Sequence, residues 1–222
     1  MAAEGDLFVS TVLHGIECKR RIIGSIAIYR FILNTNKPNL VVLPDFSNES
    51  FQNTSLNVLY RIQYLEKKYS QIYIFNFSHS NINIKEKYLK CGDIKITFLD
   101  MCANSINYVL KNVLAVSNIH ILGVGCGSGI AINLIIKDKL YRNLFLANPS
   151  HPTNITSLTK HNLSNMSIRI QWIYPDDTKT DYDDTIELIQ NKHKINITSK
   201  YYDMSVGKEV HPDFVFDICQ GK

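Results

Sequence analysis

The chain has 222 residues, of which 45% are hydrophobic and 20% are charged, and its formal net charge is +4. This composition is typical of a globular protein, and the length suits a single domain over residues 1–222 that needs no disulfide or metal to be stable. Lys and Arg are dispersed and never form the run of about five or six like charges that marks a basic tail, so nucleic-acid binding is not favoured.

Cysteine usage and hydropathy limit the remaining classes. The five cysteines include no Cys-x-x-Cys pair, which argues against a disulfide framework and a zinc site, and we expect no bound metal or cofactor. Residues 1–10 lack a basic segment followed by an apolar one, and no apolar run approaches the roughly 18 residues that cross a bilayer. We therefore expect a cytoplasmic protein without a membrane span. The excess of Asn, Ile and Lys is typical of an AT-rich genome, such as that of a large DNA virus or a protist.

The N-terminal part of the chain predicts an antiparallel hairpin. Residues 7–13 are apolar and β-branched, and His14-Gly15 suits a tight turn. Residues 16–32 resume β character, and within them apolar side chains alternate with a period of two.

Beyond residue 39, short apolar runs alternate with helical stripes. A continuous run such as Leu40-Val41-Val42-Leu43 is typical of a strand that is buried on both faces of a parallel sheet. Strands that alternate with helices imply right-handed crossovers between parallel strands. We therefore predict an α/β fold with a mainly parallel central sheet, an N-terminal antiparallel hairpin and helices on both faces. The predicted strands are residues 40–43, 72–77, 119–124, 144–147, 168–174 and 195–198, and the predicted helices are residues 50–69, 99–113, 130–136, 183–191 and 212–219.

Glycines gather in the turn between the strand 119–124 and the helix 130–136, where the sequence is Gly123-Val124-Gly125-Cys126-Gly127-Ser128-Gly129. This turn fits three descriptions, of which the first is a plain tight turn. The second is phosphate or nucleotide binding at a helix N-terminus, since Gly125-x-Gly127-x-Gly129 is similar to motif I of S-adenosylmethionine-dependent methyltransferases. The next strand ends in Leu146-Ala147-Asn148, however, where that family has an acidic residue that holds the ribose.

The third description is a nucleophile elbow, a strained turn of the pattern G-x-S-x-G that raises a nucleophile above the sheet. With Gly123 and Gly127 as the flanking small residues, the nucleophile position falls on Gly125, which has neither a hydroxyl nor a thiol. Glycine suits the strained backbone because it lacks a Cβ. Cys126 and Ser128 are the alternative nucleophiles in this stretch.

In the order of its elements, the chain resembles the α/β-hydrolase family along nearly its whole length. The elbow follows the third parallel strand, and Trp172-Ile173-Tyr174-Pro175-Asp176-Asp177-Thr178 and then His211 follow later strands, in the order nucleophile, acid, histidine. The resemblance implies a three-layer sandwich in which Asp177 is the triad acid and His211 is the triad histidine. The segment 149–167 is short, so we expect a minimal cap or none.

The same resemblance implies an oxyanion hole formed by the backbone amides of Phe46 and Cys126. Two plainer interpretations remain open. Asp176 and Asp177 also fit turn residues after Pro175, and His211 also fits a cap at the start of the C-terminal helix.

The leading hypothesis is a hydrolase-like protein that has lost its catalytic nucleophile and serves as a binding or structural component. Its ligand would be a protein partner or a small acyl or carbonyl compound. The first alternative is an active esterase, lipase or thioesterase that uses Cys126 or Ser128 with His211 and Asp177. The second alternative is a methyltransferase that binds S-adenosylmethionine at residues 125–129.

Overall fold

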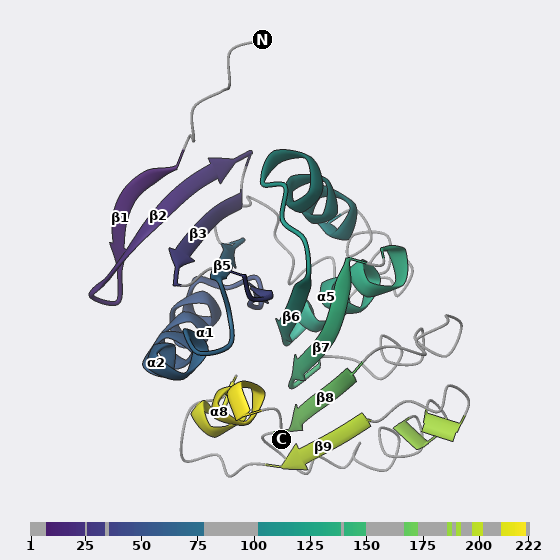
Figure 1. Ribbon diagram of the computed structural model, residues 1–222. Coiled ribbons are helices and arrows are strands. Elements are labelled where there is room, and N and C mark those ends of the chain that lie inside the picture. The colour runs from purple at the N-terminus through teal and green to yellow at the C-terminus, as the bar shows by residue number, and fades with distance from the viewer. Residues whose placement is uncertain are drawn as a thin grey trace.

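The computed structural model describes residues 8–24, 26–33, 36–77, 102–138, 140–149, 167–172, 186–187, 190–191, 197–201 and 210–220. These residues form a nine-stranded sheet with the order β1-β2-β3-β5-β4-β6-β7-β8-β9 (Figure 1). The strands are β1 (Val9–Leu13), β2 (Ile16–Ile23), β3 (Ile26–Ile32), β4 (Asn39–Leu43), β5 (Gln71–Asn76), β6 (Ile119–Val124), β7 (Tyr141–Ala147), β8 (Ser167–Trp172) and β9 (Ile197–Tyr201).

The N-terminal strands are antiparallel. β1 pairs with β2, β2 with β3, and β3 with β5, each in the antiparallel sense. His14 and Gly15 join β1 to β2 with φ of 50° and 79°, as a two-residue turn of the primed type requires. The predicted hairpin is confirmed, but the segment 16–32 contains two strands rather than one. The chain reverses at Gly24, whose φ is 60°.

The remaining strands are parallel. β4 lies between β5 and β6, and β7, β8 and β9 follow in sequence. Their side chains are buried almost without interruption in β4, β5 and β6, because helices cover both faces of this part of the sheet. The prediction of a mainly parallel sheet with antiparallel strands at one side is confirmed.

Helices pack on both faces of the sheet and complete three layers (Figure 1). One apolar cluster joins the sheet to the side chains of α1, α2 and α8, and a second cluster joins the other face to α5 and to residues 103–116. The helices are α1 (Asn48–Tyr60), α2 (Ile62–Leu65), α5 (Cys126–Lys137) and α8 (Pro212–Gln220), with a π-helical turn η1 (Val109–Val113).

The predicted helix 50–69 differs in detail from the observed one. It begins earlier because Ser47 caps α1, with its Oγ accepting a hydrogen bond from Ser50 N at 3.0 Å. It breaks at Arg61, whose φ of −103° and ψ of 18° separate α1 from α2. The predicted helix 183–191 lies mostly outside the described residues.

Candidate functional site

The turn between β6 and α5 consists of a single residue, Gly125. Its φ is 56° and its ψ is −121°, a conformation that side-chain-bearing residues rarely adopt. Gly125 N donates a hydrogen bond to Ala147 O at 2.9 Å, and Gly125 O accepts one from Ser128 N at 3.1 Å. The strand therefore passes directly into the helix through a strained turn, which is the geometry expected of a nucleophile elbow.

The two flanking glycines allow the strand and the helix to approach closely. A Cβ on Gly123 would lie 2.6 Å from Ser128 Cα, and a Cβ on Gly127 would lie 2.0 Å from Leu43 O at the end of β4. Backbone atoms fill both positions, so neither glycine can be replaced without moving the main chain. This packing gives a physical reason for the predicted flanking roles of Gly123 and Gly127.

Asp45 occupies the space above Gly125. A Cβ on Gly125 would lie 2.7 Å from Asp45 Oδ2 and 3.2 Å from Asp45 Cγ. Asp45 follows β4, and its backbone N donates a hydrogen bond to Ser50 Oγ at 3.1 Å. The carboxylate thus lies beside the first turn of α5, where the helix dipole favours a negative charge. Sequence reasoning did not single out Asp45, although its position in the loop that follows the apolar run 40–43 was a signal.

The Asp45 carboxylate also contacts the predicted oxyanion hole. Phe46 N, one of the two expected donors, donates a hydrogen bond to Asp45 Oδ1 at 2.8 Å. The other expected donor belongs to Cys126, the half-buried first residue of α5. The Phe46 ring packs against the Phe77 ring with their centroids 5.2 Å apart. A negatively charged oxygen of the protein itself therefore already uses one amide of this site.

Ser128 is part of the turn's own hydrogen bonding. Its side chain is fully buried, and its Oγ donates a hydrogen bond to Gly123 O at 2.9 Å. This bond directs the hydroxyl toward the strand–helix junction. A role for Ser128 as a nucleophile would require that bond to break and the hydroxyl to reach the site from a buried position.

His211 caps the start of α8. Its Nδ1 accepts a hydrogen bond from Asp213 N at 3.2 Å, and its carbonyl oxygen accepts one from Val215 N at 3.3 Å. Pro212 follows it at the first helical position, as is common after a cap. His211 therefore contributes capping hydrogen bonds to α8, as one interpretation of the sequence expected, and its role as the triad histidine stays a prediction.

A series of hydrogen bonds at the carboxyl end of the sheet leads from the elbow to His211. Gly125 N donates to Ala147 O at the end of β7, and Asn148 N donates to Gln171 O in β8, both at 2.9 Å. Gln171 Oε1 in turn accepts a hydrogen bond from His211 N at 2.8 Å. Neighbouring strands are about 4.8 Å apart, so β8 lies about 10 Å from β6. Asp176 and Asp177 lie outside the described residues, and their proposed roles stay predictions.

A different histidine, His120, is buried at the other end of β6. Its Nδ1 lies 3.2 Å from Tyr69 Oη, and its Nε2 lies 3.1 Å from Asn143 Nδ2. Burial, together with the positive charges of Lys68 and Arg169, lowers the pKa of His120 to about 4. Because it lies at the amino end of the parallel strand, this cluster belongs to the core and not to the elbow.

The described residues contain neither a metal-binding cluster nor a membrane-spanning helix. In the part of the chain that the structure describes, no three His, Cys, Asp or Glu side chains gather as a metal ion would require. No described helix combines the length and the apolar character needed to cross a bilayer.

Several solved structures with similar folds are distant from this chain in sequence. The enterobactin hydrolase IroE in complex with DFP matches with a TM-score of 0.58 at 13% identity, over 88% of this chain and 87% of that chain. An esterase from Pyrococcus furiosus matches with a TM-score of 0.58 at 12% identity, over 95% and 86% of the two chains. A carboxylesterase from Mesorhizobium loti matches with a TM-score of 0.58 at 11% identity, over 91% and 97%.

No protein-family model and no curated protein matches the sequence. The structural matches nevertheless establish that the chain has the α/β-hydrolase fold.

The methyltransferase alternative finds no support. The matching structures named above are hydrolases and esterases. The physical reason lies in the turn, where Gly127 packs against Leu43 O and the Asp45 carboxylate covers Gly125. The space beside Gly125 and Gly127 is thus occupied by the protein's own atoms.

Proposed function

We propose that this chain, which has the α/β-hydrolase fold, does not catalyse acyl transfer and instead acts as a binding or structural component. The observation that carries the proposal is Gly125, which stands at the nucleophile position of the elbow without a reactive atom. Acyl transfer on this fold needs a hydroxyl or thiol that the histidine can activate. The backbone of Gly125 supplies neither.

The Asp45 carboxylate supports the same conclusion. It lies where the first atom of a nucleophile side chain would be, and it accepts the Phe46 amide hydrogen bond. In an active enzyme that space holds the attacking group, and the amides receive the negative charge that develops on the substrate carbonyl oxygen. A carboxylate fixed there would repel that developing charge and exclude the ester.

The other groups of the predicted triad also favour a non-catalytic role. Ser128 Oγ is buried and donates a hydrogen bond to Gly123 O, and His211 Nδ1 accepts a hydrogen bond from a backbone amide of α8. Both contacts stabilise the fold, and both would have to be exchanged for catalysis. The ligand that we propose is a protein partner or a small acyl or carbonyl compound.

Hydrolysis of aryl esters tests the proposal directly, because the fold's solved neighbours include esterases. The purified protein should give no turnover of short-chain or medium-chain aryl esters above a buffer blank. It should also resist labelling by a fluorophosphonate probe for activated serine and by an acyl probe for activated cysteine.

The matched control is Cys126→Ala, which removes the thiol nearest to the elbow. Turnover by the unmodified protein that disappears in Cys126→Ala would show a thiol esterase and overturn the proposal. Turnover that persists in Cys126→Ala but vanishes in Ser128→Ala would also overturn it and would assign the reaction to Ser128.

A further inference from the structure

β1 is the terminal strand of the sheet among the described residues, with β2 as its neighbour. Natural edge strands usually carry a charge, a proline or a bulge that prevents pairing with another chain. β1 has the sequence Val-Ser-Thr-Val-Leu, which contains none of these residues, and its register with β2 is continuous. Val9 is 70% exposed and Val12 is 60% exposed. They project from opposite faces because side chains alternate along a strand.

The turn at His14 and Gly15 determines which backbone groups of β1 face outward. In a two-residue hairpin the closing pair, here Leu13 and Ile16, is hydrogen bonded, and hydrogen-bonded pairs then alternate along the ladder. Thr11, paired with Cys18, therefore directs its N–H and C=O toward β2. Ser10 and Val12 direct theirs toward the outer edge. β1 consequently offers two donors and two acceptors in the spacing that an antiparallel strand requires.

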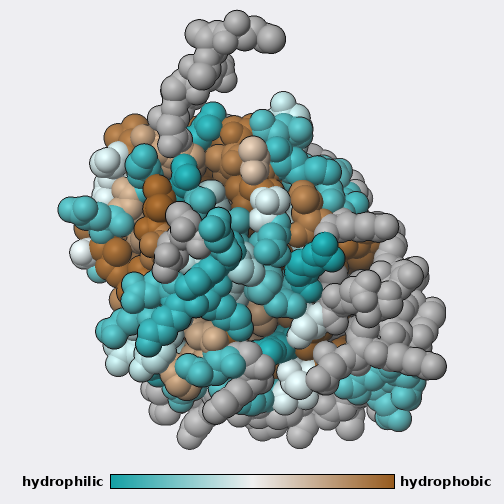
Figure 2. Space-filling model, viewed as in Figure 1, coloured by the Kyte–Doolittle hydropathy of each residue, from teal (hydrophilic) through white to brown (hydrophobic). Residues whose placement is uncertain are grey.

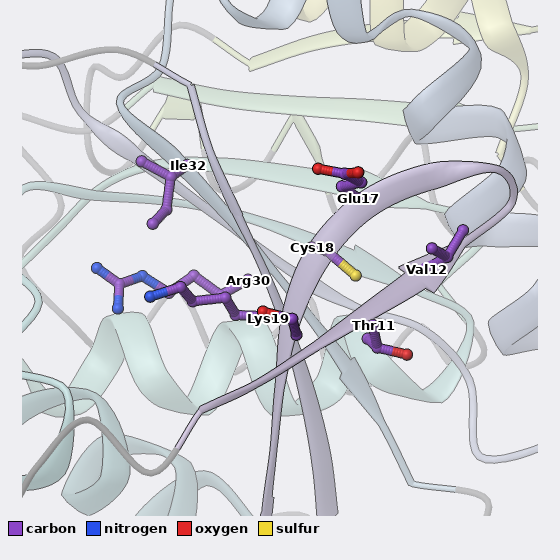
Figure 3. Close-up of a pocket in the computed structure, with 8 residues that line it drawn as sticks. Thr11, Val12, Glu17, Cys18, Lys19, Arg30 and Ile32 are labelled. Carbon is purple, nitrogen blue, oxygen red and sulfur yellow. The ribbon is translucent and has the colours of Figure 1, made fainter.

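A shallow cavity of about 570 Å³ lies along one face of these strands (Figure 3). Lys19 in β2 pairs with Ser10 on one side and with Arg30 in β3 on the other, and Glu17 pairs with Val12. Figure 3 shows Lys19 and Arg30 extending together away from β1. Apolar surface is also visible in Figure 2 over the N-terminal strands. The residues that line the cavity are Ser10, Thr11, Val12, Glu17, Cys18, Lys19, Arg30 and Ile32.

We propose that β1 pairs antiparallel with β1 of a second copy of this chain, across a two-fold axis that passes beside Thr11. In this register Thr11 faces Thr11 of the second copy as a non-hydrogen-bonded pair. Ser10 faces Val12 of the second copy, and these two residues exchange both backbone hydrogen bonds, as does the symmetry-related pair. The nine-stranded sheet would then continue without a break into that of the second copy.

The side chains of β1 fit a second copy because the strand is complementary to itself. Val9 comes opposite Leu13 of the second copy, so an apolar residue that is 70% exposed gains an apolar neighbour. On the cavity face, Lys19 and its partner Ser10 come into line with Val12 and its partner Glu17 of the second copy. This line of side chains across the interface therefore has a positive charge at one end and a negative charge at the other. The two cavities join across the axis. A two-fold interface of this kind uses one surface patch twice.

Cross-linking by a cysteine on the axis tests the register. Thr11→Cys is made in a Cys18→Ser background, because Cys18 is the β2 partner of residue 11. Non-hydrogen-bonded pairs have Cα atoms about 4.5 Å apart, within the range that a disulfide bridges. We expect a covalent dimer on mild oxidation. The matched control is Val9→Cys in the same background, whose two copies would lie about 13 Å apart and should cross-link at least about tenfold more slowly.

Sedimentation equilibrium of the unmodified chain tests association without any substitution. The pairing strand has five residues, so the interface is small and we expect a dimer that dissociates on dilution. Val12→Lys adds a charge at an exposed edge position and should weaken the dimer by at least about tenfold, whereas Val12→Thr should leave it nearly unchanged.

A monomer at all concentrations for the unmodified chain would overturn the proposal, and so would equal cross-linking of the two cysteine variants. If β1 pairs with another protein instead of a second copy, the chain alone would be a monomer, and Val12→Lys would weaken its binding to that other protein. These measurements do not depend on ester hydrolysis, so the dimer and the non-catalytic role can fail separately.

Discussion

Two glycine turns with a positive φ lie in very different surroundings. Gly125, with φ of 56°, lies in the parallel half of the sheet beneath the Asp45 carboxylate, and its neighbours Gly123 and Gly127 touch backbone. Gly15, with φ of 79°, lies in the antiparallel half, and apart from its chain neighbours no described residue has an atom within 4 Å of the position of a Cβ. A positive φ alone therefore says little about function. The packing around the glycine separates a candidate site from a simple hairpin turn.

The largest difference in stability between the two halves should be that between Gly127→Ala in the parallel half and Gly15→Ala in the antiparallel half. In Gly127→Ala the added Cβ would lie 2.0 Å from Leu43 O, a backbone atom that cannot move without disturbing β4. We expect a loss of about 3 kcal/mol or more in the free energy of unfolding, or no folded protein. Gly15→Ala is the control, for which only the backbone conformation opposes the change, at about 1 kcal/mol. Urea unfolding of both variants measures the contrast, and equal losses would contradict it.

Acidification should also destabilise the parallel half, through His120. The pKa of His120 is about 4 in the folded state, chiefly because of burial, so the unfolded chain binds the proton more tightly. Stability should therefore fall as the pH decreases from about 6.5 to about 4 and then level off for this group, with a contribution on the order of 3 kcal/mol. His120→Asn should flatten this part of the pH profile in urea unfolding. An unchanged profile would show that other groups cause the loss.

Substitutions at Gly125 and Asp45 should be coupled. Gly125→Ala alone must both strain the backbone and displace the carboxylate, and we expect a loss of about 2 kcal/mol. In an Asp45→Gly background there is no carboxylate to displace, so Gly125→Ala should lower the free energy of unfolding by about 1 kcal/mol less. A double-mutant cycle by urea unfolding measures the coupling. Additive effects would mean that Asp45 moves aside without cost.

The smallest effect should come from the exposed side chains of the antiparallel half. Ile22 is 58% exposed. Ile22→Thr keeps the β-branched shape and should change the stability of the monomer by no more than about 0.5 kcal/mol. Thermal unfolding at low protein concentration checks this value. A larger loss would indicate that this face is covered in solution.

The sheet could be predicted because its residues carry strong local signals. Leu40-Val41-Val42-Leu43 and the alternating apolar residues of β3 each determine a strand from neighbouring residues alone. The turn at Gly24 was missed because a single glycine within a continuous β pattern gives a weak signal.

Asp45 could not be assigned to the site in the same way. Its carboxylate meets Gly125 across 80 residues of sequence, through the pairing of β4 with β6. Only the three-dimensional approach of two loops makes that contact. His211 shows the converse, since its place in the order of elements suggested a triad, whereas its Nδ1 and its carbonyl oxygen accept hydrogen bonds from the first turn of α8.

The overlap of the Asp45 carboxylate with the missing Cβ of Gly125 also constrains how the gene can change. A codon for serine at residue 125 would put a side chain where Oδ2 already lies. Introduction of a serine at residue 125 would thus be eased by a second substitution in a distant codon, and the order in which the two arise would matter. A lineage that shortens residue 45 first meets less steric opposition than one that introduces the serine first.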